Sequence, residues 1–169
     1  MKTDQVYIHY GSEHFDKELF VAPKNCWWKP MPDSFTGLWA SRVDDPLGWK
    51  PWCEANEYPI SSEYFKFRLS ENKTLLVLSK PEDLEGLPHI SPEEILHSDP
   101  SFNGSSLEAE ILSHMPPEWC FLDYEKIFHS GVDAIEITEW PSLSDPLSVW
   151  DCNCIYVMNP DIVIEVDAE

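Results

Sequence analysis

Tyr64-Phe-Lys-Phe-Arg-Leu69, followed closely by Lys73-Thr-Leu-Leu-Val-Leu-Ser79, contains the clearest strand patterns of the chain and indicates its fold class. Apolar and polar side chains alternate in the first stretch, which is typical of a strand with one buried face. The second stretch has a continuous apolar centre, which predicts a buried strand. Glu71-Asn72 between them has the composition of a tight turn, so we expect the two strands to form an antiparallel hairpin.

The sequence on both sides of this pair predicts further strands, mainly near the two ends of the chain. They are expected at 5–10, 36–43, 134–138, 149–158 and 161–166. Short helices are expected at 15–20, 46–57, 106–114 and 122–129, with a capped helix start at Ser91. Strands and helices do not alternate regularly, which argues against a doubly wound sheet. We therefore predict one compact α+β domain over 1–169, with a mainly antiparallel sheet and a helical, loop-rich middle segment at 80–130.

Composition excludes several classes of function. The 169 residues include 31 acidic and 11 basic side chains, which gives a formal net charge of −20. Binding to nucleic acid in general, or to an anionic membrane, requires a basic surface that this chain lacks. The chain is nevertheless 43% apolar and contains eight tryptophans, so the charge does not indicate disorder.

The cysteines and the N-terminal residues suggest a location. Residues 1–10 lack the apolar core of a secretory signal, and no run of 18 apolar residues occurs. Five cysteines form an odd set, which favours reduced thiols and a cytoplasmic protein. Cys152 and Cys154 could chelate a metal through both thiolates, but two small buried residues on one strand face is the stronger interpretation, and we predict no metal site.

Two strands carry the residues that best fit a binding site. His9 stands near the end of the first predicted strand, directly before the turn at Gly11-Ser12. Trp39 and Ser41 are two positions apart on the second strand, so they share a face. Tryptophans at 27–28 and 49–52 flank this strand, and large aromatic planes beside a polar strand end suit a flat heteroaromatic ligand.

The segments Ile8-His-Tyr-Gly-Ser12 and Gly37-Leu-Trp-Ala-Ser41 resemble motifs of the ADP-ribosyltransferase superfamily, which includes the diphtheria-toxin-like and poly(ADP-ribose) polymerase branches. The resemblance covers about 25 residues, implies NAD as the substrate and leaves the acceptor open. It implies that His9 hydrogen-bonds the adenosine ribose, with Tyr10, Gly11 and Ser12 close to NAD. It further implies that Trp39 stacks on the nicotinamide.

Two more residues complete the expected NAD site. Ser41 would steady the Trp39 strand, and Arg42 is the better of the two arginines for a pyrophosphate contact. In this family a late strand supplies an acid, usually Glu, beside the reacting ribose. Asp151 is the only acid in 149–158, so it is the expected catalytic carboxylate, with Glu136 and Glu165 as alternatives.

A second class of function is a non-enzymatic acidic binder of the immunity, antitoxin or nucleic-acid-mimic type. The net charge would steer such a protein to a basic protein partner, and its Trp and Tyr side chains would anchor the interface. The two hypotheses predict different structures. The enzyme requires His9, Trp39 and Asp151 to meet in one pocket, whereas a simple binder would scatter them and gather its acids on one flat face.

Overall fold

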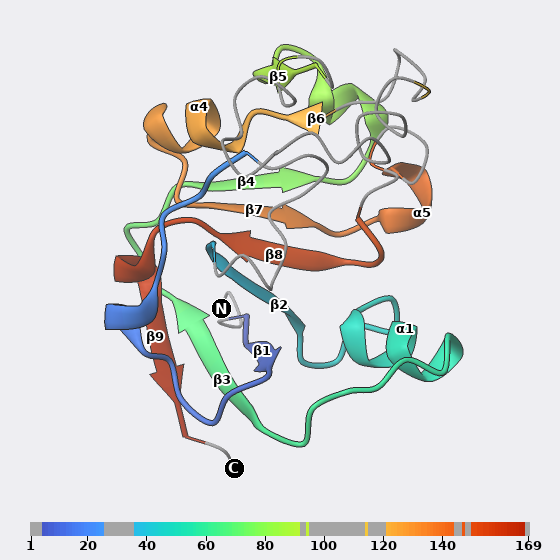
Figure 1. The fold of residues 1–169 in the computed structure, drawn as a ribbon, viewed down its shortest axis with the longest axis vertical. Helices are drawn as coiled ribbons and strands as arrows, with labels where there is room; N and C mark the ends of the chain where they lie inside the picture. The colour runs from blue at the N-terminus through green and yellow to red at the C-terminus, as the bar shows by residue number, and fades with distance from the viewer. Residues whose placement is uncertain are drawn as a thin grey trace.

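The computed structural model describes residues 5–25, 36–91, 94, 114, 121–143, 147 and 150–167. Its centre is a seven-stranded sheet in the order β4-β7-β8-β2-β1-β3-β9 (Figure 1). These strands are β1 (Tyr7–Tyr10), β2 (Leu38–Arg42), β3 (Tyr64–Leu69), β4 (Leu75–Leu78), β7 (Ala134–Ile137), β8 (Cys154–Val157) and β9 (Val163–Val166). The short strands β5 (His89–Ile90) and β6 (Phe121–Leu122) form a separate antiparallel pair.

Short helices complete an α+β fold, as predicted. The α-helices are α1 (Trp49–Ala55), α4 (Tyr124–His129) and α5 (Trp140–Leu143). The 3-10 helices are η1 (Lys17–Leu19), η3 (Pro81–Leu84) and η4 (Pro160–Ile162). Among the strand pairs that the structure describes, all are antiparallel except β4–β7.

The predicted hairpin of residues 64–79 is wrong, although both of its strands exist. β3 pairs with β1 and β9, whereas β4 pairs in parallel with β7 at the other edge of the sheet. A two-residue hairpin needs positive φ in its turn, and no residue between Leu69 and Leu75 has it. The Thr74 N–H instead donates to the Asp133 carboxylate at 2.8 Å, and the Asp133 N–H donates to the Thr74 carbonyl at 2.9 Å. These bonds direct the chain to β7.

Other predicted boundaries shift by a few residues. The strand expected at 149–158 begins only at Cys154, and η4 occupies the start of the strand expected at 161–166. The capping hydrogen bonds predicted at Ser91 are present, because its Oγ accepts from the Glu94 N–H at 3.1 Å and its own N–H donates to the Glu94 carboxylate at 2.9 Å. The helix predicted at 106–114 lies outside the described residues, apart from His114. No described helix is both long and apolar enough to cross a membrane.

Each face of the sheet has its own core because side chains alternate along every strand. On one face, β4, β7 and β8 pack against η3, β6, α4 and α5, with a core that includes Leu78, Leu122, Ile127, Ile135, Leu143, Trp150 and Tyr156. On the other face, β1, β2, β3 and β8 pack against the N-terminal segment and η4, with a core that includes Tyr7, Leu38, Phe65, Phe67, Ile155 and Ile162. The sheet is therefore covered on both sides.

A buried carboxylate on the second face pairs with a partly exposed arginine. Glu136 of β7, with 3% of its side chain exposed, accepts hydrogen bonds from Arg42 Nε at 2.7 Å and from Arg42 Nη2 at 2.9 Å. The Tyr7 hydroxyl donates to the same carboxylate at 3.0 Å. Burial and the Glu136 charge raise the pKa of Tyr7, so its hydroxyl remains protonated and donates. These contacts join three strands, β1, β2 and β7, across the sheet.

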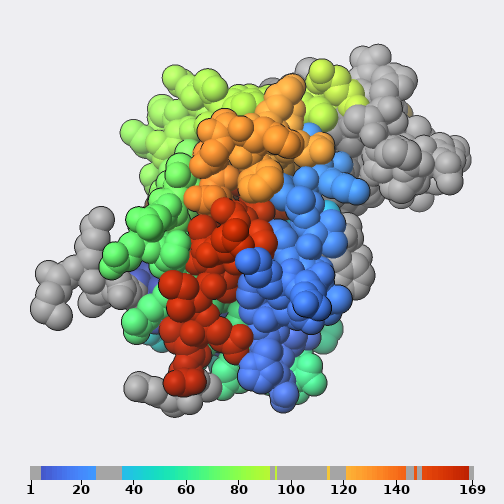
Figure 2. Space-filling model, turned by 90° about the vertical axis from the view of Figure 1, so that its left-hand side faces the viewer, coloured from blue at the N-terminus to red at the C-terminus, as the bar shows by residue number. Residues whose placement is uncertain are grey.

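The N-terminal segment lies directly beside the C-terminal segment on the surface shown in Figure 2. Glu165 of β9 accepts from His14 Nδ1 at 2.8 Å and from the Phe15 N–H at 3.1 Å. Lys17 forms a second ion pair with Asp161. Glu165, one of the alternative catalytic acids, thus holds the two ends of the described chain together.

Candidate functional site

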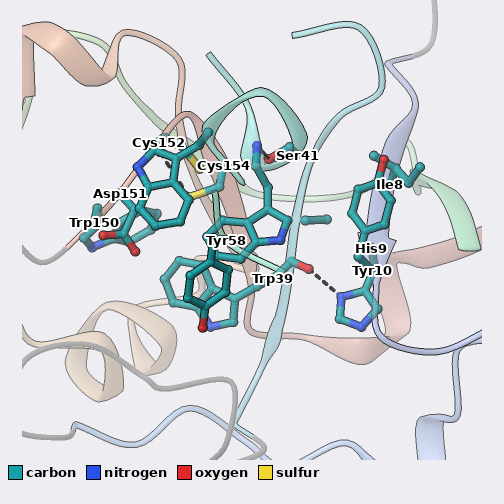
Figure 3. Close-up of a pocket in the computed structure, with 13 residues that line it drawn as sticks. Ile8, His9, Tyr10, Trp39, Ser41, Tyr58, Trp150, Asp151, Cys152 and Cys154 are labelled. Carbon is teal, nitrogen blue, oxygen red and sulfur yellow. Dashed lines mark hydrogen bonds between the residues drawn. The ribbon is translucent and has the colours of Figure 1, made fainter. Parts of the chain in front are cut away.

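A pocket of about 410 Å³ opens where β1 and β2 separate (Figure 3). The β1–β2 ladder contains only the pairs Tyr7–Arg42 and Ile8–Ser41, whereas β1 stays paired with β3 as far as Tyr10. Beyond the ladder, His9 Nδ1 donates to the Trp39 carbonyl at 2.6 Å. A side chain thus replaces the next backbone hydrogen bond, and the pocket lies beside the two separating strands.

The pocket brings together three residues that the sequence analysis placed in separate parts of one site. His9 comes from β1, Trp39 from β2, and Asp151 from the segment that precedes β8; all three line the pocket, as do Tyr10 and Ser41. Of the two alternative acids, Glu136 lies in the buried pair with Arg42 and Glu165 lies at the edge strand. Asp151 is therefore the carboxylate at this pocket.

Three other predicted residues lie outside the lining. Gly11 has φ 132°, a conformation that disfavours other residues, and a Cβ there would lie 3.5 Å from His9 Nε2. Ser12 Oγ donates to the His14 carbonyl at 3.1 Å. Arg42 lines an adjoining groove of about 320 Å³, but Glu136 already binds its guanidinium at two nitrogens. In this structure Arg42 forms an ion pair with Glu136, in place of the expected pyrophosphate contact.

Six of the described lining residues of the pocket are tryptophans or tyrosines. The Trp49 and Trp52 rings of α1 are stacked, 5.0 Å apart at 11°, and Tyr58 packs against both at 5.7 and 5.6 Å. Trp39 packs 4.7 Å from Trp150. Lysine and arginine do not occur among the described residues that line the pocket. A site with aromatic faces, one carboxylate and no basic group suits a flat or cationic ligand.

The turn after α1 places Tyr58 in this wall. The Tyr58 N–H donates to the Cys53 carbonyl at 2.9 Å, the bond of a Schellman turn, and Glu57 takes the left-handed position with φ 52°. Glycine usually holds that position, since any other residue costs about 1 kcal/mol there. The chain accepts this cost, and the turn folds Tyr58 back onto Trp49 and Trp52.

The imidazole of His9 is held in one protonation state. A carbonyl only accepts hydrogen bonds, so Nδ1 carries the proton toward Trp39 and Nε2 of the neutral ring is an acceptor. Burial lowers the pKa of His9 below its usual 6.5, and the bond to Trp39 opposes that effect only in part. His9 is therefore neutral near pH 7.

Titration by NMR checks this state of His9. We expect the His9 ring to titrate below pH 6.5 and the exposed His14 ring to titrate above it, because the hydrogen bond and charge of Glu165 raise the pKa of His14. As the pH falls, the unfolded chain binds a proton at His9 before the folded chain does. The free energy of unfolding therefore decreases as the pH falls below 6.5, and His9 does not change it above that pH. A His9 midpoint at or above 6.5 would contradict the buried, neutral imidazole.

Asn153 is a positioning residue beside the pocket that the sequence did not single out. Its buried side chain accepts from the Trp140 N–H at 2.7 Å and donates to the Thr138 carbonyl at 2.8 Å and to the Asp45 carboxylate at 3.1 Å. Its backbone N–H donates to the Leu47 carbonyl at 2.8 Å. One residue thus joins the β2–α1 loop, the end of β7 and the start of α5.

The backbone of Asn153 also reaches the pocket wall. Its carbonyl accepts from Ser41 Oγ at 3.0 Å, and Ser41 Oγ accepts from the Trp49 N–H at 2.9 Å. Ser41 therefore connects the segment that carries Asp151 to the first residue of α1. The sequence signal was an asparagine inside a predicted strand, a residue type that strands disfavour.

Replacing Asn153 by aspartate should disturb the pocket. The change removes the donor to Thr138 and places a second carboxylate about 3 Å from that of Asp45, so we expect the free energy of unfolding to fall by about 2–3 kcal/mol. Asn159→Asp is the matched control, because Asn159 Nδ2 donates to Asp133 at 2.7 Å away from the pocket. The indole N–H resonances of Trp49 and Trp52 should shift in Asn153→Asp alone. Equal shifts in both variants would refute the positioning role.

Comparison with protein-family models, with curated proteins and with solved structures gave no significant match to the chain. The site must therefore be interpreted from its own residues. Cys152 and Cys154 line the pocket, but the described part of the chain contains no group of three or more His, Cys, Asp or Glu side chains arranged to hold a metal ion.

Proposed function

We propose that this protein is an NAD-dependent ADP-ribosyltransferase whose pocket holds the nicotinamide riboside end of NAD. One observation carries the proposal. His9, Trp39 and Asp151 are far apart in the sequence, were selected from it for this chemistry, and line the same pocket. The acceptor of the ADP-ribosyl group is left open.

The wall of the pocket suits the nicotinamide ring. In NAD this ring is a flat pyridinium cation, which aromatic faces attract through stacking and through their quadrupoles. Trp39, Trp49, Trp52 and Tyr58 supply those faces. Trp39 Nε1 is a buried donor without a hydrogen-bond partner among the described residues, and the carboxamide oxygen of nicotinamide would supply an acceptor.

The ribose would lie at the end of the pocket formed by β1. Nε2 is the acceptor nitrogen of the neutral His9 ring and is suited to a hydroxyl of the nicotinamide ribose, instead of the adenosine ribose that the sequence resemblance implied. Gly11 lies two residues after His9, and the absence of a side chain there lets the backbone approach a ligand beside His9. His9 therefore orients the ribose, while its Nδ1 bond to Trp39 fixes the ring.

Asp151 would act on the reacting carbon. When the bond between ribose C1′ and the pyridinium nitrogen breaks, its electron pair neutralises the nicotinamide and the positive charge moves to the ribose. A carboxylate beside the ribose stabilises that charge and accepts the proton of the attacking water or acceptor. Fixed carboxylates of this kind lower the barrier because they need little reorganisation during the reaction.

The pyrophosphate would remain outside the aromatic pocket. Lysine and arginine do not occur among the described lining residues, and the Arg42 guanidinium already binds Glu136. A net charge of −20 also opposes an anionic ligand. We therefore assign the recognition of NAD to its nicotinamide end.

Nicotinamide release tests the proposal. Incubation of the protein with NAD should produce free nicotinamide, measured by chromatography, and millimolar NAD should raise the melting temperature. His9→Ala should abolish the release and keep the fold, whereas His14→Ala, on the exposed segment after β1, should leave it unchanged. Absence of both release and a thermal shift in the unmodified protein would overturn the proposal.

A further inference from the structure

Exposed apolar side chains are concentrated on the segment that forms the aromatic wall. The described residues include nine large apolar side chains that are exposed, and five of them lie between positions 43 and 64: Val43, Leu47, Tyr58, Ile60 and Tyr64. Single exposed apolar residues are ordinary on a protein surface, but a concentration of them beside a pocket marks a binding surface.

Three tyrosines and three glutamates belong to α1, to the turn after it and to the neighbouring ends of β1 and β3, and we call them the acidic rim: Tyr10, Tyr58, Tyr64, Glu54, Glu57 and Glu63. Tyr10 and Tyr58 line the pocket, and the Tyr64 ring lies 6.0 Å from that of Tyr10. Glu57 directly precedes Tyr58 in the Schellman turn.

The other two glutamates belong to the same surface. The Glu63 carbonyl accepts from the Gly11 N–H at 2.9 Å, which places Glu63 beside the end of β1. Glu54 lines the adjoining groove together with Tyr10. All three glutamate side chains are exposed.

We propose that the acidic rim binds a basic protein segment through its arginine or lysine side chains. Guanidinium and ammonium groups bind carboxylates by charge-assisted hydrogen bonds and stack on tyrosine faces, and the rim places both kinds of group side by side. Tyrosine is also among the residues that dominate interface energies. The net charge of −20 would accelerate the encounter with such a partner.

The rim differs from the acidic surface elsewhere on the chain. Glu71, Glu82 and Glu85 are also exposed, but Val77 is the one exposed large apolar side chain among the described residues of 71–91. Bulk charge alone would attract a basic partner to both regions alike. The inference is therefore specific to the rim and stands apart from the use of NAD.

The test compares two variants of equal charge. Fluorescence anisotropy at about 150 mM salt would measure the binding of labelled nona-arginine to the unmodified protein, to E54Q/E57Q/E63Q and to E71Q/E82Q/E85Q. We expect the rim variant to bind about tenfold more weakly and the control variant to lose less than twofold. A nona-glutamate peptide should not bind, and rising salt should weaken the nona-arginine complex.

Two results would overturn the proposal. One is the absence of nona-arginine binding to the unmodified protein, and the other is a loss in the rim variant less than fivefold greater than the loss in the control. Thermal melts check that both variants fold. If the rim variant does not fold, NMR of the unmodified protein decides: the peptide should shift the ring resonances of Tyr10, Tyr58 and Tyr64, and unchanged resonances would refute the site.

Discussion

Asp151→Asn should lower the rate of nicotinamide release from NAD by a factor of about 10²–10³, the effect of removing one preorganised electrostatic group from an active site. The amide keeps the size of the side chain but supplies no negative charge when the ribose becomes positive. The loss should appear in kcat, with little change in the affinity for NAD, because the carboxylate acts mainly in the transition state.

Asp161→Asn is the control for this substitution. Asp161 lies on η4, is exposed, and pairs with Lys17 on a surface away from the pocket. It should leave kcat within a factor of two. A similar kcat for Asp151→Asn and the unmodified protein would remove Asp151 from the mechanism, and an equal loss in both variants would point to a general effect of charge.

Arg42→Met should lower the free energy of unfolding by about 3–5 kcal/mol, measured by urea denaturation. The substitution leaves the Glu136 carboxylate, with 3% of its side chain exposed, without its cationic partner. The Tyr7 hydroxyl still donates at 3.0 Å but cannot neutralise the charge. A buried carboxylate without a partner is among the most destabilising changes in a protein interior.

The double variant Arg42→Met/Glu136→Leu tests whether Arg42 serves to neutralise Glu136 or to bind the pyrophosphate of NAD. Removal of both charges should recover at least half of the lost stability, because the desolvated carboxylate is gone. Nicotinamide release by the folded Arg42→Met protein should match that of the unmodified protein, since Arg42 lies outside the pocket lining. A large rise in the KM for NAD would instead support the pyrophosphate contact that the sequence suggested.

Alternation of apolar and polar residues was enough to predict most strands. β1, β3 and β7 each have a clear strand pattern within a few residues, so their local sequence indicates a strand wherever they pair. The main residues of the site could be predicted for a related reason. His9 stands at a strand end and Trp39 shares a face with Ser41, and both relations follow from the sequence alone.

Long-range pairing and the aromatic wall could not be predicted in the same way. The partner of β4 depends on bonds between Thr74 and Asp133, which are distant in sequence. Tyr58 reaches the pocket only because Glu57 adopts a left-handed conformation. A glycine at this position would have predicted the turn, but the sequence has a glutamate there. Asn153 acts through contacts to four other segments, and a single sequence contains no record of such contacts.

The enzyme and binder hypotheses describe adjacent parts of one surface. The proposed NAD site uses the pocket, and the proposed site for a basic segment uses the acidic rim, which shares Tyr10 and Tyr58 with the pocket lining. Salt should distinguish the two ligands. A higher salt concentration should weaken the binding of a basic peptide to the rim. It should strengthen the binding of anionic NAD, because salt screens the repulsion between NAD and the acidic protein.

Saturation-transfer difference NMR with NAD tests the central claim most directly, because it reports which end of the ligand contacts the protein. We predict the strongest transfer to the nicotinamide ring protons, weaker transfer to the adenine protons, and a loss of the nicotinamide signal in Trp49→Ala. Transfer that is strongest at the adenine, or absent at millimolar NAD, would contradict the assignment of this pocket to the nicotinamide end of NAD.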